Sequence, residues 1–288
     1  MLRDLLKITF LSFILISLMS NSCENESSPE IAALNSEMNM LSYDFAGDYE
    51  NMWRKVDSLQ NIGLYKSALN IVSIIFDSAS VAKNSPQVVK SVIHKMKYNS
   101  YMTDDEYLVA LNELKKISEE STFPLKQIIH SVTAETYWGY YQVNRWKFIN
   151  RTQTINFDND DIRTWDLTTL ANKVYKHHQL AISNKDSLQH TDIKDFDEML
   201  TSYTDDNEQR PSLYDFLAQR ALDFFQNPER NLTRPADQFK LNGKEYFGSA
   251  EAFLLLSTDS KDSLSNELYE VRILQELTKF HLTDEKPT

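Results

Sequence analysis

The stretch "RPSLYDFLAQRALDFFQNP", residues 210–228, decides the predicted fold. Nine of the thirteen positions from 213 to 225 carry apolar side chains. At about 100° per residue, the remaining acidic and amide side chains share one narrow stripe of a helix, formed by Asp215, Gln219 and Asp223. A helix that is apolar on most sides is normally buried among other helices, so the stretch predicts a core helix rather than the wall of a ligand site.

Arg220 lies between Phe216 and Phe224 on the apolar side of this helix. A buried guanidinium needs a partner, and Asp223 or a carbonyl at a neighbouring helix end would satisfy it at the lowest cost. We therefore expect Arg220 to be structural rather than functional.

The composition favours a helical protein that does not bind nucleic acid. Only 5 Gly and 7 Pro occur in 288 residues, which leaves few of the residues that strands and tight turns demand. The 30 Lys and Arg against 42 Asp and Glu give a net charge of −12, which repels phosphate backbones at long range. Hydrophobic residues make up 41% of the chain, enough for a sizeable core.

The first segment has the layout of a secretory signal. Arg3 and Lys7 flank the start of an apolar run that is too short to span a membrane comfortably. Small and polar residues precede Cys23, the only cysteine, as in bacterial lipoprotein signals. We expect lipidation of Cys23, with a plain cleaved signal as the alternative. Glu24 and Glu26 resemble the surface-export signal of Bacteroidota lipoproteins.

These features predict three parts. Residues 1–22 form the lipoprotein signal peptide, 23–47 an acidic tether, and 48–288 a helical domain with a possible subdivision near 150–164. Because Cys23 is the only cysteine, an exported chain has no internal disulfide, and its stability must come from packing.

Apolar residues recur at helical spacing through the domain. Besides the stretch above, helices are expected over residues 49–59, 65–79, 86–98, 104–118, 124–150, 165–182, 196–200 and 263–282. Two of these helices have start signals in the sequence. Ser85-Pro86 begins the helix over 86–98, and a capping box of Thr103 and Glu106 begins the helix over 104–118. Residues 150–164 and 183–192 are expected to be loops, and Asn242-Gly243 a short hairpin.

The junction "GLYKSA", residues 63–68, matches the link between the two helices of a tetratricopeptide repeat. Gly63 permits a left-handed turn, Tyr65 fills the space between the helices, and Ala68 lets their backbones approach. No second copy follows at a spacing near 34 residues. The predicted fold is therefore all-α: an irregular array of antiparallel helical hairpins, tetratricopeptide-like in part.

Other patterns point to structure rather than chemistry. The aromatic run "YWGYYQVNRWKF", residues 137–148, suits helix packing better than sugar stacking. The acidic segment 158–166 lacks the glycine and the distal glutamate of a calcium loop, and the pair His177-His178 has no metal-ligand spacing. We find no catalytic or phosphate-binding motif, and predict no enzyme activity, cofactor or metal. The structural or interface candidates are Trp138, Tyr141, Trp165, Tyr214 and Arg220.

The blocks "VDSLQNIGLYKSALNIV", "SPQVVKSVIHKMKY", "HSVTAETYWGYYQVNRWKFINRT", "DIRTWDLTTL" and, above all, "RPSLYDFLAQRALDFF" resemble one known family. In order and spacing they are similar to the N-terminal helical region of the large alpha-2-macroglobulin-like lipoproteins of Bacteroidota. These blocks are packing motifs. The resemblance covers residues 53–282, and the macroglobulin and thioester domains of the family have no counterpart in these 288 residues.

The resemblance implies a non-catalytic scaffold region of a protease trap, which is an endopeptidase inhibitor. The implied partners are membrane lipid through Cys23, downstream macroglobulin domains, and proteases; the implied location is the cell envelope, as an outer-membrane lipoprotein facing the periplasm or the outside. The alternative is a stand-alone helical surface lipoprotein that binds a glycan or a partner protein. A glycan binder would expose coplanar rings among Tyr137, Trp138, Tyr140 and Tyr141, whereas a scaffold would bury them.

Overall fold

The computed structural model describes residues 48–148, 161–199, 210–227, 239, 240, 243, 246, 248–262 and 264–284. Residues Met1–Asp48 and Tyr49–Thr288 form separate units. The helices described below all belong to the second unit. The predicted signal peptide and the whole predicted tether, Cys23 included, lie outside the described residues.

The predicted all-α fold is confirmed: helices account for the regular structure of the described residues. The α-helices are α3 (Tyr49–Asn61), α4 (Tyr65–Ala82), α5 (Ser85–Ser100), α6 (Glu106–Glu120), α7 (Leu125–Phe148), α8 (Leu167–Ala181), α9 (Lys185–Gln189), α10 (Leu213–Phe225), α11 (Ala250–Leu254) and α12 (Asn266–His281). Two 3₁₀-helices are η1 (Ile162–Thr164) and η2 (Ile193–Met199).

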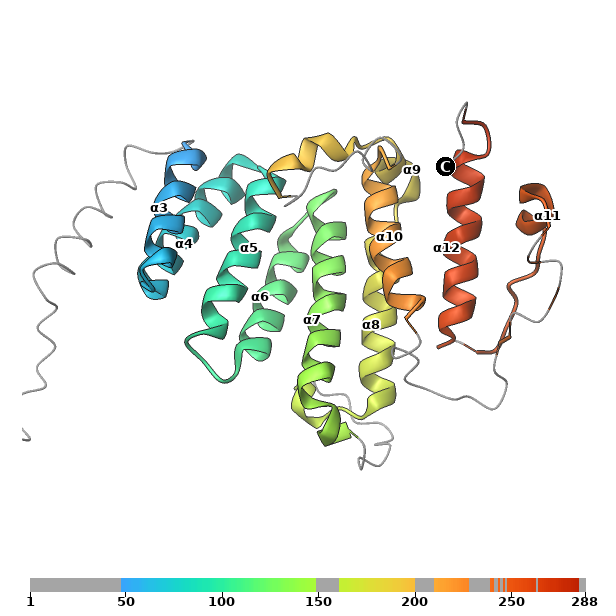
Figure 1. Ribbon diagram of the computed structural model, residues 1–288, viewed down its shortest axis with the longest axis horizontal. Helices are drawn as coiled ribbons and strands as arrows, with labels where there is room; N and C mark the ends of the chain where they lie inside the picture. Colours follow the sequence, from blue (N-terminus) through green and yellow to red (C-terminus); the bar gives the residue numbers. More distant parts are fainter. Residues whose placement is uncertain are drawn as a thin grey trace, which may run out of the picture. The chain divides into compact units, whose positions relative to one another are not determined.

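Helices α3 to α8 pack on one another in chain order, as Figure 1 shows. At the first junction Gly63 adopts a left-handed conformation with φ +78°, and the Leu64 amide donates to the Leu59 carbonyl at 2.9 Å. Ala68 is fully buried at this junction, while the Tyr65 ring stacks on Tyr101 at 4.4 Å. A small residue and a left-handed glycine thus close the turn as the sequence predicts.

Helix α10 contacts α7, α9 and α12, and its buried residues belong to the largest apolar cluster of the described residues. That cluster joins α10 to Trp138 of α7, to Val174 and Tyr175 of α8, and to Ile273 of α12. The stretch that opens the sequence argument is therefore a core helix, as its apolar density predicts.

The predicted start signals of two helices are wrong. Asn84, not Ser85, caps α5, because its side chain accepts a hydrogen bond from the Gln87 amide at 3.2 Å. Helix α6 begins at Glu106, and the Thr103 hydroxyl accepts from the Asp105 amide at 3.2 Å instead of forming a capping box. In both cases the local turn places a neighbouring residue at the cap position.

The predicted loop over 183–192 is also wrong, because it contains α9. Asn184 turns the chain in a left-handed conformation, and the fully buried Leu188 then joins the cluster around α10. This burial stabilises a helix too short for its periodicity to be seen in the sequence. The helix expected over 196–200 is part of η2, which packs on α5.

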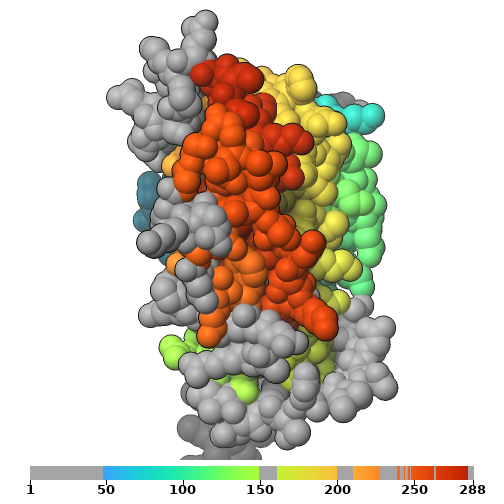
Figure 2. Space-filling model, turned by 90° about the vertical axis from the view of Figure 1, so that its right-hand side faces the viewer, coloured from blue at the N-terminus to red at the C-terminus, as the bar shows by residue number. Residues whose placement is uncertain are grey.

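Most of the segment 228–247 lies outside the described residues, including Asn242 of the expected hairpin. Figure 2 shows the face formed by the C-terminal residues, where α11 and α12 are coloured orange to red. Gln275 of α12 holds α11 by donating to the carbonyls of Phe253 and Leu256. Among the described residues, no helix is long and apolar enough to cross a membrane.

Candidate functional site

A capping box fixes the start of α10. The Ser212 hydroxyl accepts from the Asp215 amide at 3.2 Å, while an Asp215 carboxylate oxygen accepts from the Ser212 amide at 3.1 Å. The backbone there is also tied to the segment after α9, since the Leu213 amide donates to the Thr191 carbonyl at 2.8 Å. These bonds satisfy amide groups that the first turn of a helix otherwise leaves free.

The second oxygen of Asp215 binds α12. It lies 2.8 Å from Nε2 of His281, and Nδ1 of the same ring lies 2.7 Å from Asp284. Burial opposes protonation of His281, but the hydrogen bonds to the two carboxylates outweigh it and raise the pKa of His281 above its ordinary value. Protonation of the imidazole therefore strengthens the contact between α12 and α10.

The residues of the predicted polar stripe of α10 differ in burial. Asp215 is buried beneath α12, Gln219 is half-buried, and Asp223 is exposed. Gln219 donates to Asp223 at 2.8 Å. Asp215, the first residue of the stripe, is buried because α12 covers the first turn of α10.

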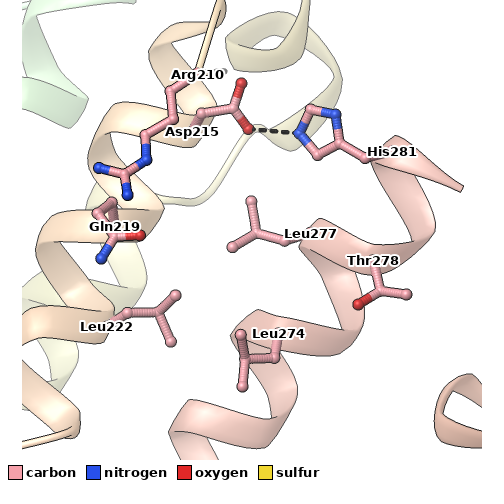
Figure 3. A pocket seen from close by; sticks show the side chains of 8 residues that line it. All are labelled: Arg210, Asp215, Gln219, Leu222, Leu274, Leu277, Thr278 and His281. Atoms are coloured by element: carbon pink, nitrogen blue, oxygen red, sulfur yellow. Dashed lines mark hydrogen bonds and ion pairs between the residues drawn. The ribbon is translucent and has the colours of Figure 1, made fainter. Parts of the chain in front are cut away.

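A pocket of about 310 Å³ lies between α10 and α12 (Figure 3). Arg210, two positions before the cap, and three residues of α10 line one side of it, and four residues of α12 line the other: Arg210, Asp215, Gln219 and Leu222, then Leu274, Leu277, Thr278 and His281. This volume is at the lower end of the range for small-molecule sites, which is about 300–1,000 Å³.

The charged groups around this pocket differ in the hydrogen bonds and ion pairs that they form. Asp215 accepts hydrogen bonds on both carboxylate oxygens, and both nitrogens of His281 face carboxylates. Since neither imidazole nitrogen is left to accept a proton, His281 is poorly placed to act as a general base. Arg210 takes part in none of the ion pairs formed among the described residues. Among the described residues that line the pocket, the charge left without an ion pair is that of Arg210, and it is positive.

The partner of Arg220 differs from the two that the sequence led us to expect. Its Nε donates to the Ser131 hydroxyl of α7 at 3.0 Å, and its guanidinium lies 5.8 Å from the centre of the Phe216 ring. Asp223, one of the two expected partners, accepts from Gln219. Arg220 cross-links α10 to α7 because Ser131 comes within reach on the packed face.

Trp138, Tyr141 and Tyr214 are packing residues in this structure. Trp138 is 4% exposed, stacks on Tyr141 at 5.1 Å and meets Phe224 of α10 edge-on at 5.6 Å. Tyr214 is fully buried, and among the described residues its hydroxyl has no hydrogen-bond partner. Burial, followed by the charge of Glu276, raises the pKa of Tyr214 above its ordinary value, so the phenol stays neutral.

The rings of the aromatic run are not presented as a sugar platform. Trp138 and Tyr140 are buried, and Tyr137 and Tyr141 are half-buried against the core. Trp146, which the sequence did not single out, is 65% exposed at the end of α7. The run therefore winds around the helix: most of its rings pack against the core, including the last one, Phe148, and Trp146 points to solvent.

Trp165 packs against the rings of this group and also lines a second pocket of about 210 Å³ between α6, α7 and α8. It is buried, with its ring 5.5 Å from Tyr137 and 5.2 Å from the Lys173 ammonium. Two carboxylates of the acidic segment act as helix caps nearby: Asp161 accepts from the Arg163 amide, and Asp166 from the Thr169 amide. Residues 149–160 lie outside the described part.

Two histidines meet beside this second pocket. Nδ1 of His130 on α7 lies 3.2 Å from Nδ1 of His177 on α8. Burial, together with nearby lysines, lowers the pKa of His130 to about 4; burial, His130 and lysines lower that of His177 to about 3. The pair is neutral near pH 7. No group of three His, Cys, Asp or Glu side chains among the described residues is arranged to hold a metal ion.

Sequence reasoning missed the pocket and the His281 clamp. The local Ser212-x-x-Asp215 pattern could have revealed the capping box. Nothing local links Asp215 to a histidine 66 positions away. Comparison of the chain with protein-family models, curated proteins and solved structures finds no match in any of the three.

Replacing Trp138 by alanine should lower the free energy of unfolding by about 3 kcal/mol, because it opens a cavity between α7 and α10. Trp146→Ala is the matched control on the same helix, and being exposed it should change stability by less than about 0.5 kcal/mol. Urea titration followed by circular dichroism measures both. Equal effects of the two substitutions would contradict the packing role of Trp138.

Acid should weaken the contact between α7 and α8. The unfolded chain protonates His130 and His177 near pH 6.5, whereas the folded chain holds their pKa values at about 4 and 3. The unfolded state therefore binds more protons in this window, and stability falls by up to about 1.4 kcal/mol per pH unit per histidine as the pH drops below 6.5. The double variant His130→Gln/His177→Gln should flatten this slope in urea titrations between pH 7.5 and 4.5. Parallel curves for variant and wild type would refute the assignment.

Proposed function

We propose that the helical unit is a non-catalytic scaffold region of an alpha-2-macroglobulin-like surface lipoprotein, a family of protease traps. The observation that carries the proposal is the packing of α10. The stretch most similar to that family is this helix, and nine of its thirteen residues are buried among other helices.

The chemically active side chains of α10 are engaged in holding helices together. Asp215 caps its own helix and binds His281, and Arg220 binds Ser131. Such contacts fix the angle and register of neighbouring helices, which is what a scaffold requires. They favour a mechanical role over a catalytic one for this helix.

The burial of Trp138 and Tyr140 also supports a scaffold over the rival glycan-binding function. Sugar recognition through stacking requires an aromatic face that is open to solvent. In the proposed arrangement lipid on Cys23 anchors the chain in the outer membrane, and macroglobulin domains downstream capture proteases.

The size of the protein in cells tests this proposal. An antibody against the helical unit should detect, in envelope fractions of the source organism, a polypeptide much larger than the 33.5 kDa of these 288 residues. Peptide mapping of that band should identify macroglobulin-type segments after residue 288. A band near 33.5 kDa without such peptides would reject the family assignment and favour the stand-alone lipoprotein.

The membrane anchor has a separate test. Wild-type protein expressed with its own signal should incorporate radiolabelled palmitate and partition with membranes, because two or more acyl chains hold a protein there stably. The Cys23→Ser variant should lose the label and partition into the soluble fraction. Labelling of the variant at the wild-type level would exclude Cys23 as the lipidated residue.

A further inference from the structure

The pocket between α10 and α12 is an elongated groove. Its α10 wall contains Asp215, Gln219 and Leu222, which stand one above another over two helical turns. Its α12 wall spans Leu274 to His281 over the same number of residues. Seven residues of helix rise about 10 Å, so the groove accommodates an extended chain rather than a compact ring system.

One end of the groove is polar and the other is apolar. Arg210, Asp215 and His281 gather where α10 begins, as Figure 3 shows. Leu222 and Leu274 lie together at the far end, and Leu277 projects between the two walls. A ligand that matches this gradient has one polar head and one aliphatic tail.

The charged residues of the groove determine which charge the polar head of a ligand must carry. The negative charge of Asp215 is balanced by the hydroxyl and amide of Ser212 and by His281, whose own second nitrogen binds Asp284. Arg210 is left without an ion pair among the described residues. A planar guanidinium binds a carboxylate through two parallel hydrogen bonds, which an ammonium cannot do.

We propose that the groove between α10 and α12 binds a small aliphatic carboxylate, with the carboxylate on Arg210 and the chain against Leu222, Leu274 and Leu277. Gln219 adds an amide beside the head. The volume of about 310 Å³ suits a ligand of roughly ten heavy atoms rather than a long lipid. Two sources supply this chemistry, a free medium-chain fatty acid and the carboxyl end of a peptide with apolar last residues.

Isothermal titration calorimetry with octanoate on the purified chain, residues 24–288, tests the proposal. Octanamide has the same tail without the charge, and N-acetyl-leucyl-leucine represents a peptide end. Octanoate should bind with one site per chain, and octanamide at least about tenfold more weakly, because a charge-assisted hydrogen bond is lost. Whichever acid binds more tightly, octanoate or the peptide, identifies the source of the ligand. The proposal is overturned if neither acid binds at 10 mM, a concentration chosen as about the weakest useful affinity.

Three variants separate specific binding from adsorption on apolar surface. Arg210→Gln should weaken octanoate binding by about tenfold or more, while Arg54→Gln, on the exposed face of α3, should leave it unchanged. Thr278→Trp enlarges a residue that lines the groove, and should weaken octanoate binding by about tenfold or more. Equal affinity of all three variants and wild type would show that octanoate binds elsewhere.

Circular dichroism verifies that each variant is folded before titration. If Arg210→Gln or Thr278→Trp unfolds, the amide-against-acid comparison on the wild-type chain still decides the proposal. The inference does not depend on the family assignment, because ligand binding and the size of the cellular polypeptide are measured separately. A large polypeptide without octanoate binding would leave the scaffold proposal standing and remove this one.

Discussion

The carboxylate of Asp215 is the constraint on which the arrangement of α10 depends. One oxygen closes the first turn of its own helix through Ser212, and the other accepts from His281 on α12. Charged hydrogen bonds of this kind are shorter and stronger than neutral ones, and burial increases their strength. Because a single side chain sets where α10 begins and where α12 docks, the two helices are fixed in one register.

Apolar burial supplies most of the energy around this clamp. Leu213, Tyr214 and Phe224 are fully buried, and burying a side chain of this size contributes about 1.5–3 kcal/mol. The burial is not directional, so by itself it tolerates several helix arrangements. The polar contacts of Asp215 with α12 and of Arg220 with α7 select one of them. Arg210, beside this clamp, forms no ion pair among the described residues.

The success of sequence reasoning differed between local and long-range features. The left-handed turn at Gly63 and the apolar stripes of α3 and α4 were predicted correctly, because a turn and a helical periodicity depend on residues that are close in sequence. The cap of α5 was misplaced by one position, since Asn84 and Ser85 are both good caps and only the turn geometry chooses between them. Helix α9 was missed because five residues are too few to show a period.

The sequence by itself determined an all-α chain with α10 as a core helix, since a helix that is apolar on most sides can be stable in water only inside other helices. It did not determine what the polar residues of that helix contact. His281 lies 66 positions from Asp215, and Ser131 lies 89 positions from Arg220. Only the packing angles of α7, α10 and α12 bring these groups together, and the same packing leaves the groove beside Arg210. Partner choice at such separations is a property of interlocking side chains, which local patterns do not encode.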